Sequence, residues 1–205
     1  MAIVTSLPLE PERAAACRDR AVRAGFCPEL ISLDAKDALP RLLSQALLHF
    51  PAGHTAHLLH RLRPMASELK TAWEQGLILS GSSGGGLCWF SFLWSASMFG
   101  DPEWVPGLSF APGAATAHHD QPGYRHPKSG PQGEGAPVSI LALENEVLLD
   151  WTPQGMEAIA IRPGAGARVL QGEGAPDRPL KTRHLSPLFA WIILARRVFT
   201  GQART

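Results

Sequence analysis

The sequence predicts an α+β fold, in which a helical N-terminal part (residues 1–75) packs against a β-barrel (residues 76–200) within a single domain, residues 1–205. Two observations predict it. Before residue 76, apolar residues recur at helical spacing. From Gly76 onward, short apolar runs follow one another between Gly and Pro residues, with no helical stretches among them. Short runs at that spacing are typical of an antiparallel sandwich or barrel.

Three stretches carry the helical pattern. Glu12–Ala24 follows a Pro and is rich in Ala and Arg. A second stretch, ended by Pro51 to Gly53, has the apolar residues Leu42, Leu43, Ala46, Leu47 and Phe50. The third, Pro64–Gln75, places Met65, Leu69 and Trp73 on one face. Apolar residues three or four apart predict helices with one buried face.

The expected strands are the runs LILS, LCWFSFLW, VPGLSF, PVSILAL, VLLDW, AIAIRP, RVLQ, RHLSP and FAWIILARRVF. Between them, Gly123–Ala136 is polar and rich in Gly and Pro, so we expect an exposed loop there. The aromatic residues of LCWFSFLW are expected in the core, with the Trp residues able to line an apolar pocket.

The composition narrows the range of possible partners and cellular locations. The formal net charge of +1 gives no general attraction to nucleic acid, which is therefore allowed but not favoured as a partner. Three cysteines without a C-x-x-C pair predict reduced thiols. The first residues show no signal peptide, and the apolar stretch Leu87–Gly100 is too short to cross a bilayer. We expect a cytoplasmic protein without a membrane role.

The segment AATAHHD predicts a metal centre. On a strand, alternate residues face the same side, so His118 and Asp120 are expected to point together and His119 away. A His and a carboxylate two residues apart, completed by a distant His, form the facial triad of non-haem iron(II). His184 in KTRHLSP is the expected third ligand, and Arg197 is the expected anchor for an anionic co-substrate.

Several segments together resemble the catalytic half of AlkB-type dioxygenases, over about residues 105–200. They are FAPGAATAHHD, APVSILAL, VLLDW, IAIRPGAGARVLQGEGA and RHLSP. The resemblance implies a double-stranded β-helix (jelly-roll) barrel that uses iron(II) and 2-oxoglutarate. It places His118, Asp120 and His184 on the three metal ligands. It also implies hydroxylation or oxidative dealkylation, with alkylated bases or modified protein side chains as substrates; a small molecule fits equally well.

The residues that would hold 2-oxoglutarate depart from the family pattern. The Asn and Tyr before A-P-G are replaced by Leu108 and Phe110, and the last strand has Trp191 and Ile193 where the family has Arg and Asn. Only Arg197 is kept, and its neighbour Arg196 is expected to face outward. A buried carboxylate without a partner is costly, so we expect 2-oxoglutarate to bind weakly or not at all. The alternatives are an iron(II) oxygenase whose substrate chelates the metal, and a non-catalytic barrel that acts as a binding module.

Two further motifs suggest functions other than an iron(II) oxygenase. Ser83 lies in G-x-S-x-G, and with Asp120 or Asp177 and then His184 the chain has the Ser, Asp, His order of an α/β-hydrolase. That fold needs parallel strands ahead of the serine, where this sequence predicts helices, so a glycine-rich hairpin turn is the favoured interpretation. His54, His57 and His60 recur every third residue without a carboxylate, which favours a half-exposed helix surface over a second metal site.

Overall fold

The computed structural model describes residues 1–5, 11–96, 100–125, 127, 129–131, 139–152, 155–170 and 176–184. The chain divides into two compact units, the first containing Met1–Gly86 and the second Leu87–Ala190.

The first unit contains a four-stranded parallel sheet with the strand order β2-β1-β3-β4. Its strands are β1 (Ala2–Thr5), β2 (Glu29–Ser32), β3 (Leu47–Phe50) and β4 (Ile78–Gly81). The residues of β1 and β3 are almost entirely buried. Strands covered on both faces read as continuous apolar runs, which is the pattern of AIV and LLHF in this chain.

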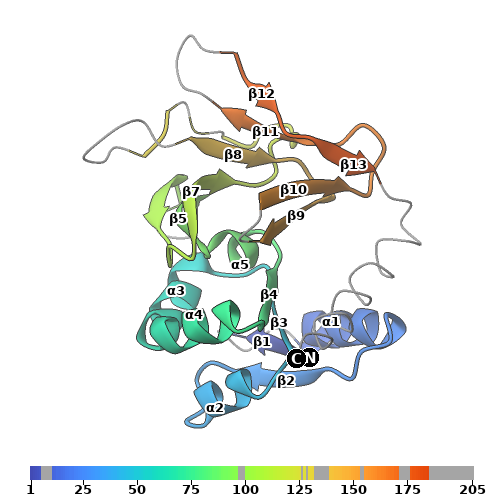
Figure 1. Cartoon of the computed structure of the whole chain (residues 1–205), viewed down its shortest axis with the longest axis vertical. Helices are drawn as coiled ribbons and strands as arrows, with labels where there is room; N and C mark the ends of the chain where they lie inside the picture. The colour runs from blue at the N-terminus through green and yellow to red at the C-terminus, as the bar shows by residue number, and fades with distance from the viewer. Residues whose placement is uncertain are drawn as a thin grey trace. The chain divides into compact units, whose positions relative to one another are not determined.

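Helices connect the parallel strands of this unit. They are α1 (Pro11–Arg23), α2 (Ala38–Leu43), α3 (Thr55–Leu62) and α4 (Ala66–Glu74), with a 3-10 turn at Arg63–Met65 and a short α5 (Gly84–Leu87) after β4. In Figure 1 the strands run between α1 on one side and α3 and α4 on the other. Leu58, Leu59 and Leu62 form the buried face of α3.

The prediction of a wholly helical N-terminal part was wrong for three segments, which form β1, β2 and β3. The helices expected at Glu12–Ala24 and Pro64–Gln75 are confirmed as α1 and α4. The stretch from Leu42 to Phe50 divides instead, with α2 ending at Leu43 and β3 beginning at Leu47. A short apolar run buried on both faces cannot be distinguished from a buried helical segment by periodicity.

The second unit contains two further sheets. A six-stranded sheet has the order β12-β11-β8-β7-β5-β6, and a three-stranded sheet has the order β13-β10-β9. The strands are β5 (Phe90–Ser95), β6 (Glu103–Pro106), β7 (Ala111–Thr116), β8 (Ile140–Leu143), β9 (Val147–Thr152), β10 (Gly155–Ala160), β11 (Ala167–Leu170), β12 (Arg178–Pro179) and β13 (Thr182–His184). Both sheets are mixed, because β5–β7, β7–β8 and β10–β13 pair in parallel.

The predicted double-stranded β-helix barrel was wrong. Among the described residues, the strands form three separate sheets, one of them wholly parallel, and no closed barrel. Most of the expected runs from residue 78 onward do contain strands; the last run lies outside the described residues. Short apolar runs determine where strands form, but their pairing depends on partners far away in the sequence, so the same runs suit a barrel and a mixed sheet.

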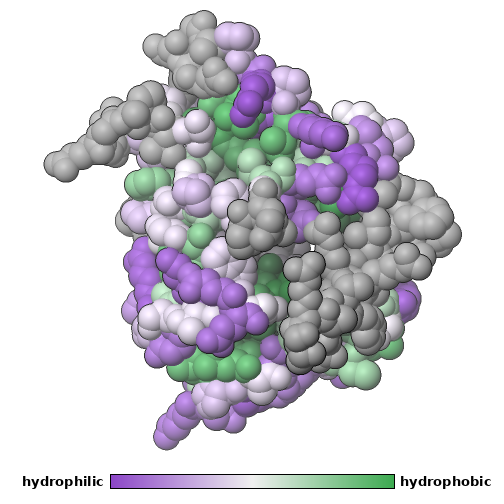
Figure 2. Space-filling view, in the orientation of Figure 1, coloured by the Kyte–Doolittle hydropathy of each residue, from purple (hydrophilic) through white to green (hydrophobic). Residues whose placement is uncertain are grey.

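Hydrophilic side chains gather on the surface of the second unit over β12 and β13 (Figure 2). The exposed residues there include Arg178, Lys181 and Arg183. Across the described part of the chain, no helix has both the length and the apolar character needed to cross a membrane.

Candidate functional site

The turn from β4 to α5 holds Ser83 in a strained backbone conformation. Ser83 has a φ of 50°, in the left-handed region. A residue with a Cβ is held there at a cost of about 1–3 kcal/mol, and such residues cluster at functional sites. A serine on a sharp turn between a strand and a helix is the arrangement of a nucleophile elbow, which exposes the hydroxyl at the end of a sheet.

The two outer glycines of G-x-S-x-G are required by close backbone packing. A Cβ on Gly81 would lie 2.2 Å from the carbonyl oxygen of Gly85. A Cβ on Gly85 would lie 2.2 Å from the carbonyl oxygen of Phe50. Contacts this short with backbone atoms cannot be relieved by a rotamer change. The glycine pattern therefore follows from the tightness of the turn around Ser83.

The loop after β3 packs directly against this turn. The N–H of Ser82 donates to the carbonyl oxygen of Phe50 at 3.0 Å. Thr55, at the start of α3, is 2% exposed. Its Oγ1 lies 2.4 Å from the position that a Cβ on Gly84 would take. Phe50 and Gly81 are partners at the carboxyl ends of neighbouring parallel strands, and sites in open α/β sheets form outside those ends.

The second unit holds a polar cluster at the turn after β7. The strand ends at Thr116, and His118 has a left-handed φ of 59°. His118 Nδ1 lies 2.7 Å from Asn145 Oδ1. Its ring also meets the ring of Tyr124, the one tyrosine of the chain, edge to face with centroids 5.8 Å apart. The prediction that a strand continues through His118 and Asp120 was therefore wrong, because β7 ends before them.

Asp120 is hydrogen-bonded through both carboxylate oxygens. Its Oδ1 accepts from the backbone N–H and from Nδ2 of Asn145, at 2.7 and 2.9 Å, and its Oδ2 accepts from Arg162. Desolvation by itself raises the pKa of Asp120. The hydrogen bonds from Asn145 and from its own backbone, together with the charge of Arg162, outweigh that effect and hold the pKa below its usual value. Asp120 is thus an anion that accepts from every partner.

Burial raises the pKa of Tyr124, and a hydrogen bond between its side chain and that of Thr116 offsets part of this effect. Tyr124 therefore remains a neutral phenol beside the His118 ring at neutral pH.

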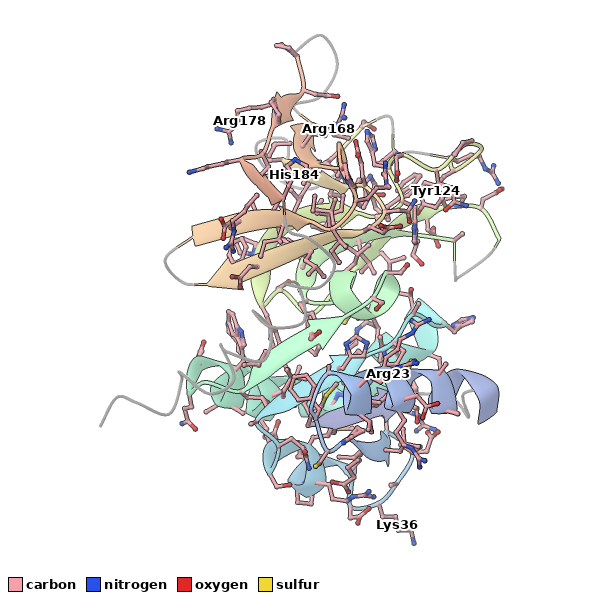
Figure 3. All side chains as sticks on the ribbon, turned by 90° about the vertical axis from the view of Figure 1, so that its right-hand side faces the viewer. Arg23, Lys36, Tyr124, Arg168, Arg178 and His184 are labelled. Carbon is pink, nitrogen blue, oxygen red and sulfur yellow. The ribbon has the colours of Figure 1, made fainter. Side chains whose placement is uncertain are left out.

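The structure brings His118 and Asp120 together around Asn145 but does not add His184 to them. His184 is exposed on β13, at the position paired with Ala160. In Figure 3 it lies well apart from Tyr124, which contacts His118. Among the described residues, no three or more His, Cys, Asp or Glu side chains gather as a group that could hold a metal ion. The iron(II) site remains a prediction from the sequence, without a supporting arrangement in this part of the chain.

The predicted co-substrate anchor, Arg197, lies outside the described residues, as do Arg196, Trp191 and Ile193. Leu108 and Phe110 precede β7 rather than lying on a strand, and Phe110 is buried against Trp89, with ring centroids 5.2 Å apart. The binding of 2-oxoglutarate remains untested.

Two residues of the polar cluster, Asn145 and Arg162, were missed by the sequence analysis. Neither lies in a motif, and both follow strands whose pairing the sequence did not reveal. His54, His57 and His60 do lie on or at the start of a helix, α3, with His54 as its N-cap accepting from the N–H of His57.

No protein-family model matches the chain, and no curated protein matches it. Solved structures do match. One is described as the crystal structure of a peptidase from an acI-B1 Actinobacterium. It is 14% identical, with a TM-score of 0.62, over 89% of this chain and 80% of that chain. At this identity the likeness concerns the fold alone.

Proposed function

We propose that this protein is a serine hydrolase with Ser83 as its nucleophile. The observation that carries the proposal is the left-handed turn of Ser83 between a parallel strand and a helix, held by Gly81 and Gly85. The sequence analysis set the hydrolase aside because parallel strands were missing ahead of Ser83. The structure has three strands of the parallel sheet there and the fourth leading into the turn, so that objection no longer applies.

The proposed reaction is acyl transfer to Ser83 followed by hydrolysis. Ser83 Oγ bonds to the carbonyl carbon of the substrate while its proton passes to a general base. The leaving group departs with a proton, and water then attacks the acyl-serine to release the acid and restore the hydroxyl. The N–H of Gly84, the residue after the nucleophile, is the donor that an elbow supplies to the developing oxyanion.

We propose peptides as the substrate class. The support is the likeness in fold to a structure described as a peptidase. A mixture of short peptides of varied sequence, incubated with the protein and analysed by mass spectrometry, tests this. Cleavage by the wild type that disappears in Ser83→Ala supports it. Hydrolysis of simple esters without cleavage of any peptide would point to an esterase.

The nucleophile is tested with a fluorophosphonate probe. We expect covalent modification of Ser83, located by mass spectrometry of the digested protein. Ser83→Ala should abolish it, whereas Ser82→Ala, a matched change one residue earlier, should not, because Ser82 contributes its backbone N–H to the turn. Absence of labelling at Ser83 in folded wild-type protein would overturn the proposal.

A further inference from the structure

A buried threonine packs against the turn that holds Ser83. Thr55, the first residue of α3, is 2% exposed. Among the described residues of the first unit, it is the one buried polar or charged residue. Burial of a hydroxyl costs free energy that an apolar side chain of similar size would avoid. Packing alone therefore does not account for a threonine at this place.

The hydroxyl of Thr55 occupies the space that a side chain on Gly84 would need. Its Oγ1 lies 2.4 Å, and its Cβ 3.5 Å, from the position that a Cβ on Gly84 would take. Because that position is one covalent bond away from the Cα of Gly84, the hydroxyl packs against the backbone of Gly84 itself. The φ of Gly84 is not in the left-handed region. The contact with Thr55, rather than the backbone conformation, is what requires a glycine there.

Thr55 is itself held firmly in place. A threonine side chain is branched at Cβ, so it has few rotamers and resists displacement. The first turn of α3 is closed by the N–H of Leu58, which donates to the carbonyl oxygen of His54 at 3.0 Å. Leu58 is buried and anchors this turn of the helix in the core. The hydroxyl of Thr55 is therefore a fixed surface against which Gly84 packs.

The peptide between Ser83 and Gly84 carries the N–H that, in the proposed function, donates to the oxyanion. Such a donor stabilises the transition state only when it is aligned with the oxyanion in advance. The next N–H, that of Gly85, donates within the turn to the carbonyl oxygen of Ser82 at 3.0 Å. We propose that Thr55 is a positioning residue that fixes this peptide and thereby directs the N–H of Gly84 at the developing oxyanion. This catalytic role rests on the proposed function, whereas the contact itself does not.

The contact is tested by a double-mutant cycle on stability. Gly84→Ala should lower the midpoint of urea denaturation, because the new Cβ meets the Thr55 hydroxyl. Thr55→Ala removes that hydroxyl, so Gly84→Ala should shift the midpoint much less in the Thr55→Ala background. A double variant that folds where Gly84→Ala alone does not would support the contact in the same way. Equal shifts in the two backgrounds would overturn the inference.

The catalytic role is tested by comparing an ester with its thionoester, in which sulfur replaces the carbonyl oxygen. Sulfur is a weak hydrogen-bond acceptor, so a well-aligned oxyanion donor favours the ester. We expect Thr55→Ala and Thr55→Val to lower kcat for the ester about tenfold, less than the loss of an oxyanion donor outright. KM should stay nearly unchanged, and the preference for the ester should fall. Thr55→Ser, which keeps the hydroxyl, should retain the wild-type values.

The matched control is Thr71→Ala, the same change at an exposed threonine of α4, which should leave kcat and the ester preference unchanged. A loss of folded protein would lower both rates in the same proportion and leave their ratio as it is. An unchanged ratio in Thr55→Val, which fills the same space, would therefore overturn the inference. Wild-type protein that hydrolyses neither substrate and takes no fluorophosphonate at Ser83 would instead contradict the proposed function, and with it the catalytic role of Thr55.

Discussion

Ser83 and His118 share an unusual backbone conformation, with φ values of 50° and 59°, but different forces hold them. The turn at Ser83 is held by steric packing, since backbone atoms fill the space where Gly81 and Gly85 would carry side chains, and the Thr55 side chain fills it at Gly84. The turn at His118 is bordered by polar side chains, with Asn145 bound to both His118 and Asp120, and Arg162 bound to Asp120.

Because of this difference, the two turns should respond to different perturbations. Packing against backbone is sensitive to a single added methyl group and insensitive to salt or pH. A network of ionised and hydrogen-bonded side chains responds to pH and ionic strength and tolerates small changes of volume. The two turns can therefore be disturbed separately.

The largest effect is expected from Gly85→Ala. The new Cβ would lie 2.2 Å from the carbonyl oxygen of Phe50, so the loop after β3 must move. We expect a loss of about 3 kcal/mol in the free energy of unfolding, the upper end of the usual cost of overpacking. Chemical denaturation measures it. Gly53→Ala is the control, since nothing lies within 4 Å of its Cβ position; equal stability of the two variants would show that the turn is not tightly packed.

A smaller effect is expected from Asp120→Asn. The side chain is 26% exposed, so its charge-assisted bonds should contribute about 1 kcal/mol at pH 7 after solvent screening. Because the pKa of Asp120 is lowered in the folded protein, this contribution is present above the unfolded pKa of about 4 and is lost as the pH falls through the folded pKa. Denaturation of both proteins at pH 7 and in strong acid checks this: a stability difference that persists in acid would contradict it.

The sheet of the first unit should respond at milder pH. Burial lowers the pKa of His49, whose Nδ1 lies 3.1 Å from Ser80 Oγ. A histidine with a lowered folded pKa contributes stability that is complete above its unfolded pKa of about 6.5 and declines as the pH falls below it. We expect a loss of under about 1 kcal/mol between about pH 7 and pH 5.5. His49→Asn, which cannot titrate, should flatten this part of the stability profile; an unchanged profile would assign it to other groups.

No effect is expected from a metal chelator on the labelling of Ser83 by a fluorophosphonate. Attack by a serine hydroxyl assisted by a general base requires no metal ion. Labelling rates with and without EDTA, together with metal analysis of the purified protein, check this. Iron bound at one ion per chain and lost in His118→Ala would instead support the iron site predicted from the sequence.

The sequence predicted where strands form better than it predicted which strands pair with one another. The apolar runs around Phe90–Ser95 and Gly155–Ala160 were correctly placed as strands. The G-x-S-x-G pattern around Ser83 was found, but its interpretation depended on whether the preceding segments were helices or strands. Buried parallel strands such as Leu47–Phe50 lack the alternation that identifies a strand, so the wrong prediction of helices ahead of Ser83 is what set the hydrolase aside.

The sequence by itself determined the local features: the helices α1 and α4, the positions of most later strands, and the presence of Ser83 between glycines and of His118 near Asp120. The tertiary structure decided what surrounds them. That Gly85 packs on Phe50, and that Asn145 rather than His184 contacts His118, depends on strand pairings between residues tens of positions apart. Such pairings arise from burial of the whole sheet, and no local pattern encodes them.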